Sequence, residues 1–286
     1  MRILTALMLA ALIALPTFGQ DAPPADPPKD PPPVEPPVEP APDDPPVKPP
    51  SEEELRLKLV ESTAREKADT LKKRMEAAKT DQERSAAISD TCGGSNYVQH
   101  PLVADAVIPY LNPRQIRAGL IYGDGVINSA IEALKKQPFD ETYYGVKKMI
   151  DANRTNIGYV QKLVLIFGEI KCVKAIDMLV DMVRDKRDGR VALCKVAADQ
   201  LGKIAHRDAI SQLIAELEEQ DKAGPNDVKL KQRRADLNTT VLNALKQITA
   251  QDYKLASQYR SWWIKNAETF QKEKKTPPPD DGSGGK

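Results

Sequence analysis

Histidine and cysteine are scarce in this sequence, with two histidines and three cysteines among 286 residues. Phosphate-binding loops, dinucleotide fingerprints and paired zinc ligands are missing as well. A chain so poor in nitrogen and sulfur ligands has little with which to hold a metal ion. We therefore predict no catalytic residues, no cofactor and no metal site, and interpret the protein as a non-enzyme.

The few cysteines and histidines still form two pairs that we considered as sites. Cys92 and His100 flank a Gly-Gly-Ser turn, which resembles a thiol nucleophile with its base but lacks an orienting group and an oxyanion site. Cys172 and His206 occupy equivalent positions of two repeats, too far apart for one metal ion. We interpret the thiols as small buried hydrophobes. The sequence leaves open whether any two of Cys92, Cys172 and Cys194 pair.

Long apolar runs are also missing, apart from one at the start of the chain. Arg2 precedes the apolar stretch 3–15, which Pro16 ends, and Thr17 and Gly19 are the small residues that a signal peptidase reads. We predict a signal peptide over residues 1–19 and a secreted or periplasmic mature protein. The alternative, an uncleaved membrane anchor, is disfavoured because this stretch is shorter than the roughly 20 residues that span a bilayer.

Acidic and proline residues dominate the next segment. Residues 21–50 contain 15 of the 24 prolines, no aromatic residue, and seven acids against two lysines. Such a segment cannot build a core, so we expect residues 20–50 to form a disordered spacer that could extend about 90 Å as polyproline II. We expect residues 272–286 to be a disordered tail. The rest of the chain is only mildly basic, which argues against nucleic acid as a partner.

Residues 51–80 predict a charged amphipathic helix. Ser51 and Glu54 have the spacing of a capping box, which marks a helix start. A narrow apolar stripe follows, formed by Leu57, Val60, Ala64, Leu71, Met75 and Ala78. We expect this helix to cap the first repeat; the alternative is a coiled pair with a second chain.

Residues 81–271 contain an internal repeat. The segment 167–183 aligns with 201–217 at a shift of 34 residues, with five of 17 positions identical and three apolar exchanges. The identical pairs are Gly168 with Gly202, Ile170 with Ile204, Ala175 with Ala209, Ile176 with Ile210, and Leu179 with Leu213. A third copy follows at a shift of 44, after a turn-rich insertion over 220–227.

Each repeat predicts two helices whose apolar faces only a neighbouring repeat can cover. We therefore predict an all-α fold, an α-solenoid of about four to five stacked helical hairpins, and leave open the number of repeats upstream of residue 157. The two glycines, Gly168 and Gly202, are expected to allow close approach at the turn within each hairpin.

These repeats resemble the HEAT-repeat superfamily, including the PBS-lyase type. The last hairpin is similar to that of exported bacterial members, through Ile248, Thr249, Asp252, Tyr253, Trp262 and Trp263. The resemblance implies an armadillo-like helical scaffold for protein binding. Alternative functions are a HEAT-like lyase or cofactor-handling protein and a structural envelope spacer. Partner identity, biological process and oligomeric state stay open.

Three sets of residues are the candidates for defined roles. The second helices of the repeats predict a partner-binding surface of Asp177, Met178, Asp181, Met182, Gln212 and Glu216. The basic run Lys229, Lys231, Arg233 and Arg234 predicts either a solvated helix start or a patch for an anionic partner. For Trp262 and Trp263 we expect a structural role, covering the apolar face of the last repeat.

Overall fold

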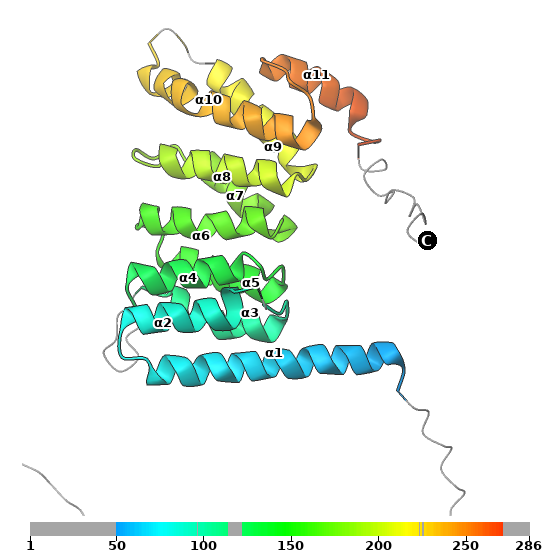
Figure 1. The fold of residues 1–286 in the computed structure, drawn as a ribbon. Helices are drawn as coiled ribbons and strands as arrows, with labels where there is room; N and C mark the ends of the chain where they lie inside the picture. Colours follow the sequence, from blue (N-terminus) through cyan, green and yellow to red (C-terminus); the bar gives the residue numbers. More distant parts are fainter. Residues whose placement is uncertain (1–49, 96, 114–121, 223, 225, 271–286) are drawn as a thin grey trace, which may run out of the picture. The chain divides into compact units, whose positions relative to one another are not determined.

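A computed structural model of the protein describes residues 50–95, 97–113, 122–222, 224 and 226–270. The described residues form helices and connecting turns and contain no strand, so the predicted all-α class is confirmed (Figure 1). The predictions of a signal peptide, a proline-rich spacer and a disordered tail concern residues that lie outside the described part, apart from Pro50. In chain order, the α-helices are α1 (Glu52–Ala77), α2 (Asp81–Ile88), α3 (Pro101–Val107), α4 (Asp124–Leu134), α5 (Asp140–Ala152), α6 (Ile157–Glu169), α7 (Ile176–Val183), α8 (Val191–Ile204), α9 (Asp208–Asp221), α10 (Val228–Thr249) and α11 (Ala256–Asn266). Shorter helical turns are the π-helical η1 (Ser89–Gly93) and the 3₁₀ turns η2 (Ile108–Leu111) and η3 (Val173–Ala175).

Most helices pack on the helix that follows two places later in the chain. One series of contacts runs from α2 to α4, α6, α8 and α10, and a second joins α1 to α3, α3 to α5, α7 to α9, and α9 to α11 (Figure 1). Leu, Ile, Val and Ala side chains fill the spaces between successive helices and form one core cluster. Most helices therefore bury an apolar face against the corresponding helix of the next pair, and the second series is interrupted between α5 and α7.

The backbone repeats along with the sequence. Lys171, Ala205 and Ala250 are the described non-glycine residues with a positive φ, at 51°, 53° and 59°. Lys171 follows the end of α6 by two residues, while Ala205 and Ala250 directly follow α8 and α10. A left-handed residue is a common way to end a helix because it turns the chain while satisfying the last carbonyl groups. Lys171 and Ala205 are 34 residues apart, which is also the shift of the sequence repeat.

Close packing occurs at both repeat glycines, but between hairpins. A Cβ atom on Gly168 of α6 would lie 2.0 Å from Oε1 of the buried Gln200 in α8, and one on Gly202 of α8 would lie 3.1 Å from the Cα atom of Ala244 in α10. The expectation of close approach is confirmed, and its place at the turn within a hairpin is wrong. Ile204 is buried and the equivalent Ile170 is half-buried. Gly168 and Gly202 therefore allow the close spacing of α6, α8 and α10.

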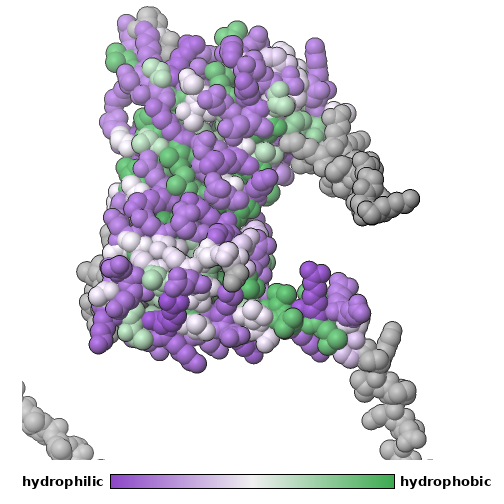
Figure 2. All heavy atoms as spheres, viewed as in Figure 1, coloured by the Kyte–Doolittle hydropathy of each residue, from purple (hydrophilic) through white to green (hydrophobic). Residues whose placement is uncertain are grey.

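Helix α1 begins where the sequence predicts. The Ser51 side chain accepts a hydrogen bond from the Glu54 amide at 3.2 Å, and the Glu54 carboxylate accepts one from the Ser51 amide at 2.8 Å, so the capping box is confirmed. Only the second half of the apolar stripe is buried, however. Leu57 and Val60 are exposed, as Leu55 is. Hydrophobic residues lie at the surface of the projecting end of α1 (Figure 2). Helix α1 therefore packs on α2 and α3 through the part of the stripe from Ala64 onward, and Leu57 and Val60 take no part in this packing.

The last helix carries the two tryptophans. The rings of Trp262 and Trp263 stack with centroids 6.2 Å apart. Both tryptophans are half-buried; Trp263 packs against the core and lies under the Arg207 guanidinium. The proposed role of the pair as a cover for the last repeat stays a prediction. Among the described residues, no helix combines the length and apolar character that crossing a bilayer requires.

Candidate functional site

The segment between α7 and α8 lies between residues of the predicted partner-binding surface and residues of the predicted basic patch. This segment, 184–190, has the sequence RDKRDGR, with four basic and two acidic side chains. A cleft lies on each side of it: one faces α5 and α7, and the other faces the start of α10. Arg187 lines both clefts. We call these the α7 cleft and the α10 cleft.

The α7 cleft has an apolar floor and a charged rim. Its volume is about 180 Å³. The apolar lining residues are Ile150, Val160, Met178, Met182 and Leu193. The charged lining residues are Asp151, Arg154, Asp181, Arg187 and Arg190. Three residues of the predicted partner surface therefore line one cleft: Asp181 is exposed, while Met178 and Met182 are half-buried and pack against the core.

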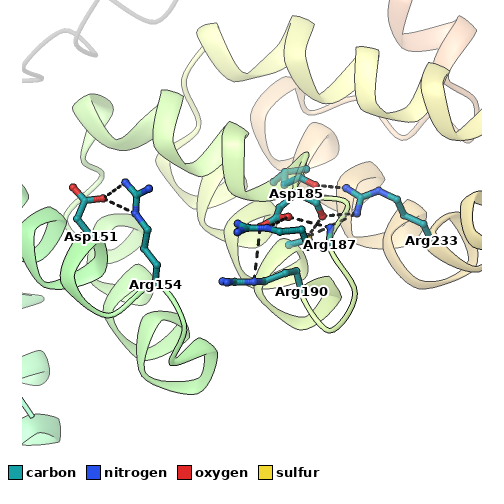
Figure 3. Close-up of polar contacts among 8 residues, drawn as sticks. Asp151, Arg154, Asp185, Arg187, Arg190 and Arg233 are labelled. Atoms are coloured by element: carbon teal, nitrogen blue, oxygen red, sulfur yellow. Dashed lines mark hydrogen bonds and ion pairs between the residues drawn. The ribbon is translucent and has the colours of Figure 1, made fainter.

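One side of the rim is formed by the end of α5. Arg154 donates from Nε and Nη2 to one oxygen of Asp151, at 3.2 and 2.7 Å (Figure 3). Lys147 donates to the other oxygen at 2.6 Å. The hydrogen bonds from Lys147 and then Arg154 hold the pKa of the Asp151 carboxyl below its usual value. Asp151 therefore stays ionised and orients the Arg154 guanidinium, whose side chain is 70% exposed.

The other side of the rim is the 184–190 segment itself. Arg187 donates two parallel hydrogen bonds to the Asp185 carboxylate, from Nε to Oδ1 at 2.8 Å and from Nη2 to Oδ2 at 2.5 Å (Figure 3). Arg190 lies 3.9 Å from the same carboxylate. The hydrogen bond from Arg187 lowers the pKa of Asp185. Because the carboxylate is almost buried and the Arg187 side chain is 71% exposed, the pair presents a fixed cation at the surface.

Two residues of the predicted surfaces are inside the protein. Arg233 of α10 was expected in a solvated basic patch, and Glu216 of α9 on an outward face; both expectations are wrong, because their exposed fractions are 8% and 2%. Arg233 donates from Nε to Glu216 at 2.9 Å, and from its two terminal nitrogens to the carbonyls of Asp185, at 2.9 Å, and Val183. Gln220 donates to the same Glu216 oxygen at 2.9 Å. A charged residue is buried here because its partners complete its hydrogen bonds.

Arg233 therefore holds the start of the 184–190 segment in place. Its guanidinium bridges α9, α10 and the end of α7, which positions the backbone that carries Arg187 and Arg190 (Figure 3). The second oxygen of Glu216 has no hydrogen-bond partner among the described residues. The pair is consequently a structural support of the site, and only the small exposed part of Arg233 contributes to the lining of the α10 cleft.

The rest of the predicted basic patch remains at the surface. Lys229 lines the α10 cleft, which has a volume of about 610 Å³, and lies 3.4 Å from Asp188. Lys231 is exposed, and Arg234 is exposed and lies 2.9 Å from Asp221. The structure thus separates the run into three surface residues and one buried residue, because a helix turns successive side chains to different faces.

The other residues of the predicted partner surface lie apart from the α7 cleft. Asp177 is exposed on α7 but does not line the cleft. Gln212 of α9 is half-buried and accepts a hydrogen bond from Arg184 at 2.6 Å. The six predicted residues therefore do not form one continuous surface.

The three cysteines and His100 have contacts that fit a structural role. Burial raises the pKa of the Cys92 thiol to about 11, and His100 accepts a hydrogen bond from the Leu102 amide at the start of α3. Burial also raises the pKa of the Cys172 and Cys194 thiols. All three cysteines are free thiols. The described part of the chain contains no group of three or more His, Cys, Asp or Glu residues suited to hold a metal ion.

The sequence analysis missed the residues that make the site, Arg154, Arg187 and Arg190 with their aspartates. Their signal was the run of charges over 184–190, between two helices of the clearest repeat. Periodicity along helix faces does not detect residues in a connection between helices. Segments between helices commonly carry binding residues on a rigid scaffold.

Comparisons with protein family models and with curated proteins find no match to this chain. The site must therefore be interpreted from its own chemistry. That chemistry consists of a small apolar cleft, two oriented and exposed arginine side chains, and a buried ion pair that supports the segment between them.

Proposed function

We propose that this protein is a non-catalytic scaffold that binds another protein, built as a HEAT-like α-solenoid and exported to the cell envelope or beyond. The observation that carries the proposal is the α7 cleft, an apolar depression rimmed by oriented arginines. Arginine beside an apolar floor is typical of the central part of protein interfaces.

The solenoid proposal is supported by the order of helix packing. Helices pack on the next helix but one, in two series, and a left-handed residue recurs at or near the end of α6, α8 and α10. A solenoid predicts both features, because each repeat contacts its neighbours and repeats their turn. The relation to HEAT repeats rests on the resemblance of the sequence motifs.

The size and polarity of the α7 cleft favour a side chain as its occupant. Its volume of about 180 Å³ is below the roughly 300–1,000 Å³ that is common for small-molecule sites. An aliphatic side chain of a partner could occupy the floor while a neighbouring carboxylate receives hydrogen bonds from Arg154 or Arg187. The larger α10 cleft, which shares Arg187, would receive the adjoining part of the partner.

The test compares partners captured from an envelope extract by the parent chain, by Arg187→Glu and by Lys246→Met. Arg187 and Lys246 are both exposed, but only Arg187 lines the clefts. We expect the charge reversal to reduce capture of the specific partner by about tenfold or more, as loss of a charge-assisted hydrogen bond would. Lys246→Met should capture it as the parent does. Equal capture by all three chains would show that the clefts are not the binding site.

A further inference from the structure

The projecting end of α1 presents aliphatic side chains among acids. The first half of this helix extends beyond α2 and α3, the helices that cover its second half (Figure 1). Leu57 is 63% exposed in this part of α1. On a helix, the surface neighbours of a residue lie three and four positions away along the chain. For Leu57, these neighbours are one further aliphatic residue and three acids, with no base among them: Val60, Glu53, Glu54 and Glu61.

One of these acids has no partner of its own. Glu54 accepts a hydrogen bond from the Ser51 amide, and Glu61 lies 3.1 Å from Arg65. No described residue donates a hydrogen bond to the Glu53 carboxylate, which lies one helical turn before Leu57. Outside α1, the large aliphatic residues that are exposed in the described chain are each next to a lysine: Val173, Val228, Leu255 and Ile264. The combination of an exposed aliphatic residue with an excess of acids is therefore a property of α1.

The α7 cleft has the complementary chemistry. Its volume of about 180 Å³ is similar to the roughly 150 Å³ of a protein cavity that holds benzene, so one leucine side chain fits. The segment 184–190 has four basic and two acidic residues, and residues 147–154 at the end of α5 have three basic and one acidic. Asp177 and Asp181 of α7 reduce this excess without cancelling it. Positive charge therefore predominates around an apolar floor.

The two exposed arginines at the rim still have hydrogen-bond donors to offer. Arg154 uses Nε and Nη2 for Asp151, and Arg187 uses the same two atoms for Asp185 (Figure 3). The Nη1 group of each donates to no described residue. Because the aspartates already orient both guanidinium groups, an arriving carboxylate orders little additional side chain, which lowers the entropic cost of binding.

We infer that the projecting end of α1 of a second copy of this protein binds in the α7 cleft, with Leu57 on the apolar floor and Glu53 on the arginines of the rim. The end of α1 cannot reach the cleft of its own chain, because α1 is one uninterrupted helix whose second half is held by α2 and α3 (Figure 1). The inference rests on the proposed function of the cleft and names the partner as a copy of the same chain.

The first test measures self-association of the full chain by sedimentation velocity over a range of concentrations. Leu57→Ser and Arg187→Glu should each weaken association about tenfold, the factor for one buried aliphatic side chain or one charge-assisted hydrogen bond. Leu55→Ser is the control for the first variant, since Leu55 is exposed and residues two positions apart do not share a helix face. Lys246→Met is the control for the second variant, because Lys246 is exposed and does not line the α7 cleft.

Mixing the two weakened variants tests which surfaces meet. A mixture of Leu57→Ser and Arg187→Glu chains combines one intact α1 end with one intact cleft. It should therefore associate more strongly than either variant alone. Circular dichroism checks that each variant keeps the helical content of the parent.

A cross-linking experiment locates the contact. Photoreactive benzoylphenylalanine replaces Leu57 in the full chain, and the same group at Leu55 is the control. Mixing ¹⁴N- and ¹⁵N-labelled chains identifies the cross-links that join two copies. Cross-links between copies from position 57 should concentrate in residues 150–193, which line the α7 cleft, and should exceed those from position 55.

The inference is wrong if the parent chain does not self-associate at any concentration tested. It is also wrong if Leu57→Ser abolishes association while Arg187→Glu leaves it unchanged, since that result indicates a coiled pair of two α1 helices. Should partner capture from the extract still depend on Arg187 in either case, the proposed function stands with a different protein in the cleft. If neither capture nor self-association depends on Arg187, both proposals fail.

Discussion

Replacing Arg233 by methionine tests how the site is supported. Methionine keeps much of the length and apolar stem of the side chain but has no charge and no donor. The substitution leaves Glu216 buried without its cation, and it removes the donors to the carbonyls of Val183 and Asp185. The perturbation therefore acts on the contact of α9 and α10 with the segment 184–190.

The expected loss of stability is large. Removing one partner of a buried ion pair costs about 3–5 kcal/mol because the remaining charge stays desolvated. Arg234→Met is the matched control, since Arg234 is the next residue of α10, pairs with Asp221 at 2.9 Å and is 48% exposed. An exposed pair contributes about 0–1 kcal/mol. With about 2–4 °C per kcal/mol for a chain of this size, Arg233→Met should lower the melting temperature by roughly 6–20 °C.

The assay is thermal and urea unfolding followed by circular dichroism at 222 nm for the parent and both variants. Adding Glu216→Leu to Arg233→Met should recover part of the loss, because the unpaired carboxylate is removed while the two carbonyls remain without their donor. If Arg233→Met is no less stable than Arg234→Met, the buried pair does not support the segment and the reasoning is refuted.

Three further predictions concern the glycine contact, the thiols and pH. Gly168→Ala should lower the free energy of unfolding by about 1–3 kcal/mol through overpacking. Gly158→Ala in the same helix should leave the stability unchanged or raise it, because an added Cβ meets nothing within 4 Å there. Equal melting temperatures of the two variants would contradict the close approach at Gly168. A thiol reagent at about pH 8 should modify only Cys172 in the folded protein, since Cys92 and Cys194 are buried, and all three cysteines in urea. Rapid modification of more than one cysteine in the folded protein would contradict this packing. The pKa of Asp185 is lowered in the folded state, so its ion pair stabilises fully above the unfolded value of about 3.9 and the stabilisation is lost as pH falls through the folded pKa. Asp185→Asn should thus be less stable than the parent at pH 7, and the difference should shrink as pH falls below about 3.9 in urea titrations. A difference that does not shrink would have another cause.

Local features of the fold followed from the sequence because they depend on neighbouring residues. The capping box of Ser51 and Glu54 needs only two side chains three positions apart, and it is present. The 34-residue repeat predicted the helices of two hairpins, which appear as α6 to α9. Helical periodicity also identified Leu179 and Leu213 as core residues, and both are buried.

Features that depend on distant residues were decided by tertiary packing. The stripe on α1 is continuous in sequence, yet Leu57 is exposed and Leu71 buried, because the helices that pack on α1 cover only its second half. The clefts likewise form where α5, α7 and α10 approach the segment 184–190. No periodicity within one helix encodes where the neighbouring helix ends.

The sequence by itself determined the helices, their caps and their repeat, since hydrogen bonds and side-chain spacing over one or two turns are sufficient for these. Only the tertiary structure decided which charged residues are ligands of a surface and which are supports of the core. Arg233 and Arg234 are adjacent and chemically identical, but one meets Glu216 and two carbonyls in the interior and the other faces water. A charge is buried only where partners from other helices replace its water, and those partners are brought together by the fold.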